Sequence, residues 1–247
     1  MPQSFFIWKG IDCRSMGVIL SGPVAIGRPE ERVNHVQIPG RSGDLTETEG
    51  PDVYNSYIQT ASIAVRTGMR VREIYAWLRG SGYVTFSGEP DRRQQARVIG
   101  AITLNKHSRN LDWWEGEVQF YCQPFKELLW PKTETVAASG SEIRNAGDVS
   151  CRPEWTVTVS GSGADKTVVL AAAGDGTPAE NSITVTGLTG GSVIRIDSDA
   201  MEVWNADGTQ LLTKNSAGEF PVMAPGANVI TGSGWSGVTV DKRERFL

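Results

Sequence analysis

The stretch Met69–Asp91, MRVREIYAWLRGSGYVTFSGEPD, holds the helix around which the rest of the chain is organised. Its apolar residues recur at the i, i+3, i+4 and i+7 spacing of an α-helix and predict a single apolar face. That face consists of Val71, Ile74, Tyr75 and Leu78. Gly80 follows where a helix end commonly needs positive φ. Because the rest of the chain has the pattern of strands and turns, we expect the helix to cover the face of a sheet.

The composition is that of an ordinary globular protein. Hydrophobic residues make up 39% and charged residues 21% of the 247 residues, which argues against a disordered chain. Residues 1–130 carry 15 basic and 14 acidic side chains, and residues 131–247 carry 9 and 14, for a net charge of −4. Neither half is basic enough to bind nucleic acid through phosphate neutralisation, so no sequence-specific nucleic-acid binding is expected.

Cysteine spacing and hydropathy point to a cytoplasmic site of synthesis. Cys13, Cys122 and Cys151 are too far apart for a disulfide framework or a zinc site. Cys122 falls on the apolar face of a predicted strand, so we expect a buried thiol there. The first residues have neither a basic segment nor a sustained apolar core, so no signal peptide is expected. No run approaches the ~20 apolar residues of a membrane span, so no membrane insertion is expected.

The N-terminal half predicts a β-sandwich-like domain with one helix and a long β-hairpin. In the hairpin, strands over 92–104 and 113–122 flank a polar turn. Residues 44–56 are polar and lack periodicity, and they predict a long loop or an arm. Just before them, the turn Pro39–Asp44 is tight and glycine-rich, so Arg41 is expected to be displayed rather than buried. Shorter strands are predicted over 4–8, 16–20, 33–38, 57–66 and 83–86.

The composition changes over residues 132–149, which are rich in small and polar residues and predict a linker. We therefore expect two domains, over 1–131 and 150–247. The second contains only short strands, separated by glycine-rich turns, which predicts a β-sandwich or jelly roll. Its strands are expected at 155–159, 167–170, 182–185, 192–196, 201–204, 228–231 and 237–240.

The sequence offers little material for catalysis. Its two histidines, His35 and His107, fall in a strand and in a turn, without a recognisable nucleophile motif. Asp197, Asp199 and Glu202 form an acidic cluster, but the cluster lacks the glycine and the remaining oxygens of a calcium loop, which favours a solvated turn. We therefore expect no enzyme, no cofactor and no metal site, while a two-carboxylate glycosidase stays open as an alternative.

Three tryptophans are candidates for a binding surface. Trp113 and Trp114 are neighbours on a predicted strand and point to opposite faces, so one is expected in the core and the other exposed or at a subunit contact. Trp235 lies in the glycine-rich turn GSGWSG and is the more exposed candidate, which could stack on a sugar. Because aromatic residues are enriched at protein interfaces, we favour a protein contact for any exposed one.

Short motifs follow one another along the first half of the chain. They are Phe6–Asp12 (FIWKGID), Pro39–Gly43 (PGRSG), Trp77-Leu78, Val84–Phe86 (VTF), Glu89–Asp91 (EPD) and Phe120–Phe125 (FYCQPF). In order and spacing, this half resembles the N-terminal domain of siphophage distal tail (Dit) proteins. No single motif is specific, so the resemblance rests on the set.

The second half carries further matching features. They are Asn145-Ala146-Gly147 with Pro153, Ile196-Asp197-Ser198 before Val203-Trp204, Phe220-Pro221, Pro225–Asn228, and the basic residues Arg243 and Arg245. They resemble the galectin-like jelly roll that many distal tail proteins carry after the ring domain. The resemblance covers nearly the whole chain and leaves no room for an inserted carbohydrate-binding module.

The resemblance implies a structural virion protein at the distal end of a long non-contractile phage tail. It implies a homohexameric ring that joins the tail tube protein to the tail-fibre or tail-lysin hub, with the tape-measure protein passing through the lumen. A closed ring needs two different contact patches on each subunit. We expect the arm and the hairpin to supply them and the helix to lie outside the lumen. Candidate contact residues are Arg41, Glu47, Glu49, Tyr54, Trp113 and Trp114.

The alternative is a carbohydrate-binding module of the tail tip that contacts host cell-wall glycans. In that case Trp235 is the candidate for stacking on a sugar ring.

Overall fold

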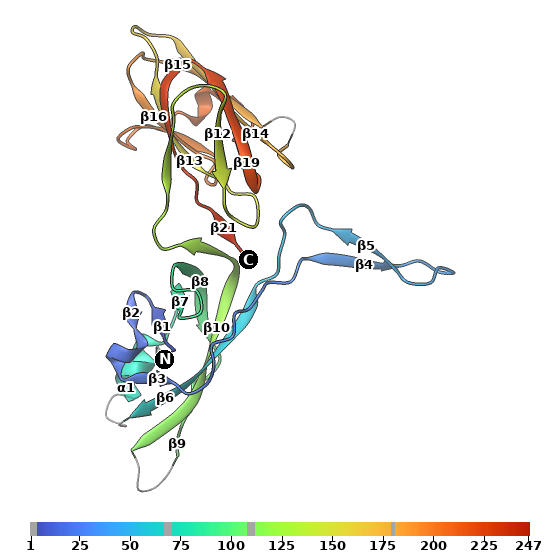
Figure 1. Ribbon diagram of the computed structural model, residues 1–247, viewed down its shortest axis with the longest axis vertical. Helices are drawn as coiled ribbons and strands as arrows, with labels where there is room; N and C mark the ends of the chain where they lie inside the picture. The colour runs from blue at the N-terminus through green and yellow to red at the C-terminus, as the bar shows by residue number, and fades with distance from the viewer. Residues whose placement is uncertain (1–3, 67–70, 108–111, 179–180) are drawn as a thin grey trace. The chain divides into compact units, whose positions relative to one another are not determined.

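The computed structural model describes residues 4–66, 71–107, 112–178 and 181–247 of the chain (Figure 1). The chain divides into two compact units, Met1–Leu129 together with Leu247, and Trp130–Phe246. The described residues are mainly β-strand and contain one α-helix, α1 (Val71–Trp77). This confirms the mainly β fold class that the sequence predicts, with curled sheets of the β-sandwich type. No helix of the described part is long and apolar enough to span a bilayer.

Unit 1 is built on one large antiparallel sheet, in which the strand order is β2-β1-β7-β8-β10-β6-β3 and β9 pairs with β10. Strands β7 and β8 are neighbours in the sequence and pair with each other. Strand β10 pairs with β8 along one edge and with β6 along the other. A 3₁₀ turn, Cys13–Met16, separates β2 from β3. The strands are β1 (Phe6–Trp8), β2 (Ile11–Asp12), β3 (Val18–Leu20), β6 (Tyr57–Arg66), β7 (Ser81–Phe86), β8 (Arg92–Ile99), β9 (Leu104–Lys106) and β10 (Trp113–Leu128).

Helix α1 covers the inner face of this sheet, as the sequence predicts. Ile74, Trp77 and Leu78 are buried in the same core cluster as Phe6 and Trp8. The rings of Phe6 and Trp77 stack with their centroids 5.6 Å apart. The indole N–H of Trp8 donates to Trp77 O (3.1 Å) and that of Trp77 donates to Trp8 O (3.2 Å). These reciprocal bonds satisfy both buried donors and fix the helix to β1.

The helix differs from the prediction in which residues it buries. Tyr75, expected on the apolar face, is 38% exposed, and Trp77 is buried instead. The buried residues Ile74, Trp77 and Leu78 still have helical spacing, but the buried face of the helix is turned towards Trp77. The expected left-handed Gly80 is confirmed, with φ of 71°.

The predicted hairpin forms between β8 and β10, with two corrections. First, the strand expected over 92–104 is interrupted: β8 ends at Ile99 and β9 begins at Leu104. The interruption begins at Gly100, whose φ is 71°, and the chain then runs so close to β10 that a Cβ on Gly116 would overlap Thr103 O. Second, β10 does not end near Cys122 but continues to Leu128 through a register shift between Cys122 and Lys126.

A separate two-stranded sheet forms within unit 1 from β4 (Val33–Gln37) and β5 (Asp44–Thr48) (Figure 1). The loop or arm expected over 44–56 is therefore partly wrong, because its first residues form a strand. The sequence DLTET gave no alternation because almost every side chain of β5 is solvent-exposed. We define residues 30–55 as the arm. Among the described strands, β4 and β5 pair only with each other.

Unit 2 is a sandwich of two five-stranded antiparallel sheets, with orders β11-β20-β13-β16-β17 and β12-β19-β14-β15-β18. Buried residues of both sheets meet in one core, which includes Trp155, Leu170 and Val238. The first sheet comprises β11 (Thr133–Val136), β20 (Trp235–Asp241), β13 (Glu154–Val159), β16 (Val193–Asp197) and β17 (Glu202–Asn205). The second comprises β12 (Ser141–Asn145), β19 (Gly226–Ser233), β14 (Lys166–Gly174), β15 (Ser182–Leu188) and β18 (Ser216–Gly218).

Two strands of unit 2 lie in the segment where the sequence predicts a linker. Residues 132–149 contain β11 and β12, each of which pairs along its length with a strand of the sandwich. Val136 and Ile143 are buried in the core of this unit. The segment looked like a linker because its few apolar residues are spaced among Gly, Ser and Ala. The short strand β21 (Arg245–Phe246) follows β20 near the end of the chain.

Candidate assembly surface

The arm exposes most of its side chains. In the pairing of β4 with β5, Val36 lies opposite Leu45 and Asn34 lies opposite Glu47. These two pairs are neighbours on the same face of the arm. Val36 is 42% exposed, and Ile38, two residues further on, is 40% exposed. Single exposed apolar residues are common, but here they lie together on a hairpin that has no core of its own. The arm therefore offers an apolar face near its tip that the rest of unit 1 does not cover.

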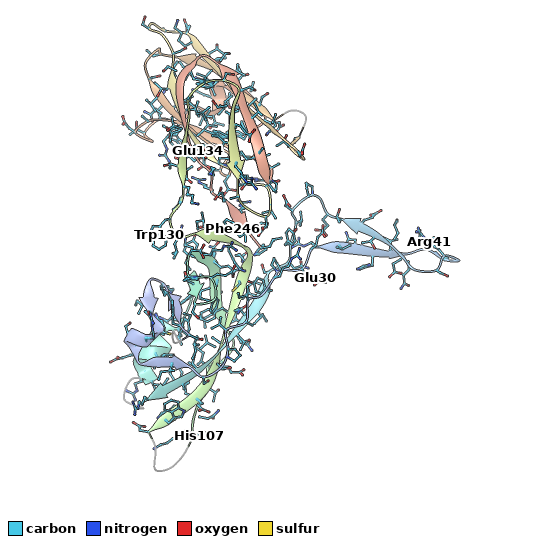
Figure 2. All side chains as sticks on the ribbon, in the orientation of Figure 1. Glu30, Arg41, His107, Trp130, Glu134 and Phe246 are labelled. Atoms are coloured by element: carbon cyan, nitrogen blue, oxygen red, sulfur yellow. The ribbon has the colours of Figure 1, made fainter. Side chains whose placement is uncertain are left out.

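The tip of the arm is a turn that presents Arg41. Figure 2 labels Glu30 near the base of the arm and Arg41 at its far end. Arg41 N donates to Ile38 O over 3.1 Å, and the flanking Gly40 and Gly43 have φ of 86° and 81°. The Arg41 side chain is exposed, as the sequence predicts, and makes no ion pair within the described part of the chain. A shallow hollow at the tip is lined by Gln37, Ile38, Pro39, Arg41, Gly43 and Asp44.

The two glutamates predicted as contact residues differ in their surroundings. Glu47 lies on β5 opposite Asn34 and is exposed. Glu49 is also exposed, and its carboxylate lies 3.4 Å from the Arg32 guanidinium across the arm. An exposed pair of this kind contributes little to stability, so both carboxylates are available to an external partner.

Tyr54 lies at the base of the arm and contacts its own subunit. Its ring meets that of Phe125 on β10 edge to face, with the centroids 5.9 Å apart. Glu31 and Tyr54 form an isolated β-bridge, and Asn55 N donates to Glu30 O over 2.8 Å. The structure therefore gives Tyr54 a place in the junction between the arm and the large sheet. Whether it also contacts another subunit stays a prediction.

The two tryptophans that begin β10 are both half-buried. Trp114 packs against the core of unit 1, and its N–H donates to Asp112 over 3.0 Å. Trp113 is paired in register with Arg66, and its N–H donates to Glu115 Oε1 over 2.7 Å. Trp114 is thus the one of the two that packs against the core, and a contact of Trp113 with another subunit stays a prediction.

Trp235 is not the exposed residue that its glycine-rich surroundings suggest. It begins β20, is half-buried and packs against the core of unit 2. Its buried indole N–H has no hydrogen-bond partner among the described residues. The ring can fold inwards because Gly232 and Gly234 bring the chain against β14, where a Cβ on either would overlap a backbone oxygen. The expectation of exposure was therefore wrong.

An exposed pair on the outer face of the large sheet was not among the predicted contact residues. Ile58 on β6 and Tyr121 on β10 are register partners, 53% and 41% exposed. Arg97 on β8 is the partner of Tyr121 on its other side. The only signal in the sequence is the apolar Ile58 on the otherwise polar face of its strand.

The acidic cluster of unit 2 is engaged in ion pairs. Asp197 lies 2.9 Å from Arg243, and Asp199 lies 2.7 Å from Arg245. Burial alone would raise the pKa of Asp197, but hydrogen bonds from Ala200 N–H and from Arg243 lower it below the ordinary value. No group of three or more His, Cys, Asp or Glu residues in the described ranges could hold a metal ion. Asp197 and Asp199 therefore belong to structural ion pairs, and Glu202 accepts a hydrogen bond from the Trp204 N–H over 2.9 Å.

The thiols and histidines show no nucleophile arrangement. Cys13, Cys122 and Cys151 are free and buried, so the predicted buried thiol at Cys122 is confirmed. Burial raises the pKa of Cys122 and of Cys151 to about 12, which keeps both as unreactive thiols. His35 is exposed on β4, and His107 Nδ1 lies 3.6 Å from Glu115.

Comparison with known proteins defines the fold of the whole chain. No family model and no curated protein matches it. Among solved structures, the chain has the fold of a phage tail hub protein. In particular, it is similar to the Dit protein (gp 19.1) of phage SPP1, described as a paradigm of the hub adsorption apparatus in phages that infect Gram-positive bacteria. The TM-score is 0.79 at 15% identity, over 99% of both chains.

A second likeness is to a chain of the phage P2 baseplate in its activated conformation with calcium. It has a TM-score of 0.50 at 7% identity and again covers 99% of both chains. At these identities the likenesses establish the fold and its extent along the chain.

Proposed function

We propose that this chain is the distal tail protein of a phage or prophage with a long non-contractile tail. Six copies would form a ring that joins the tail tube to the host-adsorption apparatus. The observation that supports this best is the end-to-end match to the SPP1 hub protein, which covers 99% of both chains. The ordered motifs of the N-terminal half support it independently. A likeness confined to one β-sandwich would be much weaker support, because common folds serve many functions.

The proposed role is structural and not enzymatic. The partners that follow are other copies of the chain, the tail tube protein, the fibre or lysin hub and the tape-measure protein. The location that follows is the virion, after synthesis in the host cytoplasm. For unit 2 we propose a galectin-like arrangement, which its two five-stranded sheets favour.

The arm supplies the most promising contact with a neighbouring subunit. It exposes apolar and charged side chains but has no core of its own, which is the pattern of a segment that is covered on assembly. We propose that Arg41, Glu47 and Glu49 face a neighbouring subunit, with Trp113 and Trp114 near a second contact. A ring requires such unlike patches.

Mass photometry and negative-stain imaging of the purified protein, alone and with its tail tube protein, test the ring. The expected result is a six-membered ring, under one or both conditions. A stable dimer under both would overturn the proposal. Labelling of intact virions with antibodies against unit 2 gives an independent readout, and label along the tail or on the capsid, and not at its distal end, would contradict the proposed location.

Arg41→Ala tests the tip of the arm. The expected result is an unchanged melting temperature and at least a tenfold higher dissociation constant of the ring, because the exposed Arg41 side chain makes no ion pair with any described residue. Arg72→Ala, which removes an exposed arginine on helix α1 outside the arm, is the matched control. An unchanged ring would remove Arg41 from the interface.

The carbohydrate-binding alternative has weaker support, because its candidate residue Trp235 is half-buried and packs against the core of unit 2.

A further inference from the structure

A segment of irregular chain, residues 23–28, leads from β3 to the arm and lies against the large sheet. We refer to it as the strap. None of its residues takes part in a strand or makes a backbone–backbone hydrogen bond, although all six are described. Backbone groups that lie against a protein surface need other partners. The strap is therefore held by side chains.

Three side chains of the large sheet hold the carbonyl groups of the strap. Gln59 Nε2 donates to Ala25 O. Gly27 O lies 3.2 Å from Tyr57 Oη and 3.4 Å from Lys126 Nζ. Gln59 and Lys126 are buried, with 5% and 6% of their surface exposed. A buried amide without a partner is destabilising, so the bond to Ala25 O helps to satisfy the buried Gln59 amide. The Lys126 ammonium group also has Leu247 O as a partner, over 3.3 Å.

Neighbouring groups hold two of the three donors, Lys126 and Tyr57, in place. Lys126 Nζ lies 2.7 Å from a carboxylate oxygen of Glu89, whose other oxygen pairs with Arg92 at 2.8 Å. Tyr57 Oη is also 3.1 Å from Gln94 Oε1, so its single hydrogen can serve either acceptor. Burial raises the pKa of Tyr57 to about 12, which keeps the hydroxyl protonated. Tyr57 and Lys126 thus have partners on the sheet in addition to the strap.

The strap approaches this set so closely that only glycine fits at its centre. A Cβ on Gly27 would fall inside contact distance of the Tyr57 ring and 2.9 Å from Gln59 Oε1. Gly27 does not have a positive φ, so the requirement is one of space and not of backbone conformation. A methyl group there would lift the strap away from its three donors.

The other end of the arm is attached to the same sheet. Tyr54 packs on Phe125, as described above, and Arg32 N donates to Val53 O over 2.9 Å, which ties the two strands at the base. Beyond this base, β4 and β5 bury almost nothing. The direction of the arm can therefore be fixed only by its two attachments.

We infer that Tyr57, Gln59 and Lys126 are positioning residues, which hold the strap and thereby set the direction in which the arm leaves unit 1. The relevance of this direction to ring formation rests on the proposed function. The anchor itself does not, because it is a property of the single subunit.

Distance measurements between spin labels test the anchor in isolated subunits. Labels are placed at Thr46→Cys on the arm and at Glu117→Cys on β10, both exposed positions. The native thiols are buried, so labelling is selective. We expect a single narrow distance distribution in the parent protein. Gly27→Ala and Gln59→Leu should at least double its width.

Two matched variants control for general damage. Gly22→Ala changes a glycine whose Cβ would meet only Ser62, at an ordinary 3.5 Å. Gln95→Leu changes an exposed glutamine on β8. Both should leave the width unchanged. Tyr57→Phe keeps the ring and removes only the hydroxyl, so it should give an intermediate width even if Gly27→Ala reduces the yield of folded protein.

An unchanged width in folded Gly27→Ala and Gln59→Leu would overturn the inference, as would equal broadening in the controls. Ring formation by the same variants, measured by mass photometry, separates the two proposals. A broadened arm with a normal ring would leave the anchor intact and would remove the direction of the arm from the assembly mechanism.

Discussion

Two tryptophans, Trp8 and Trp77, join helix α1 to the sheet of unit 1 through their rings and through reciprocal hydrogen bonds. Each indole N–H is buried and bonded to the carbonyl of the other residue. Loss of one indole ring removes buried apolar area and leaves a cavity. It also removes the hydrogen bond to the carbonyl of the other tryptophan, and each of these effects lowers the stability of the fold.

We expect Trp77→Ala to lower the free energy of unfolding of unit 1 by about 3–5 kcal/mol, the range for large aromatic residues in cores. Urea unfolding followed by circular dichroism provides the measurement. Tyr75→Ala on the same helix is the control, and as a surface change it should cost less than about 1 kcal/mol. Similar losses for both variants would contradict the assigned burial.

The buried thiols predict a specific response to alkaline pH. The pKa of Cys122 and Cys151 is about 12 in the folded chain because of burial, against an ordinary value of 9.0. The folded state thus favours the neutral thiol. The stability that these thiols contribute is fully present below pH 9.0 and is lost as the pH rises towards 12. We expect the free energy of unfolding to fall over this window, with a shallower fall in Cys151→Ala.

A reagent for free thiols checks the same groups at pH 8. None of the three cysteines should react in the native protein, and all three should react in denaturant. Fast reaction of a native thiol would show that it is accessible.

Among the elements, prediction from sequence succeeded where apolar residues recur at a regular spacing, as in α1 and in the exposed strand β4, and failed where they do not. Helix α1 was predicted because Ile74 and Leu78 keep the period of a helix. The strand β5 was missed because DLTET is almost wholly exposed and carries no alternation. The break in the hairpin at Gly100 depends on the close approach of Gly116 to Thr103, which is visible only in three dimensions.

The arm is the element whose removal should affect assembly without affecting the fold. Replacement of residues 32–53 by Asn-Gly joins Glu31 to Tyr54, which already form a β-bridge, and keeps the packing of Tyr54 on Phe125. We expect the melting temperature to change by less than ~3 °C, because the arm buries little apolar area. Mass photometry should show no ring. A normal ring from this variant would exclude the arm as a subunit contact.

At the scale of the whole molecule, each unit has its own core. No residue belongs to both clusters. We expect Trp155→Ala, in the core of unit 2, to destabilise that unit by about 3–5 kcal/mol. Scanning calorimetry of Trp155→Ala should show a lower melting temperature for unit 2 and an unchanged one for unit 1. Trp77→Ala should lower the melting temperature of unit 1 alone. A single transition lowered equally by both variants would show that the units unfold together.

The overall class of the molecule could be predicted from the sequence, and parts of the candidate assembly surface could not. Two mainly β units were expected, although β11 and β12 lie where a linker was predicted. Arg41 could be placed at an exposed turn because Pro39, Gly40 and Gly43 mark it. Trp235 was misplaced because its glycines, taken as a sign of an exposed turn, instead allow the ring to fold against the core.

The charge of the arm bears on how free subunits behave in a crowded cell. Residues 30–55 contain six acidic and two basic side chains, a net of 2 − 6 = −4. Each arm also has two strand edges open to pairing with other chains, a common route to aggregation. Like charges keep such edges apart in dilute buffer, and salt screens them. The free subunit should therefore be most soluble at low ionic strength. At high salt it should aggregate through the open strand edges of the arm.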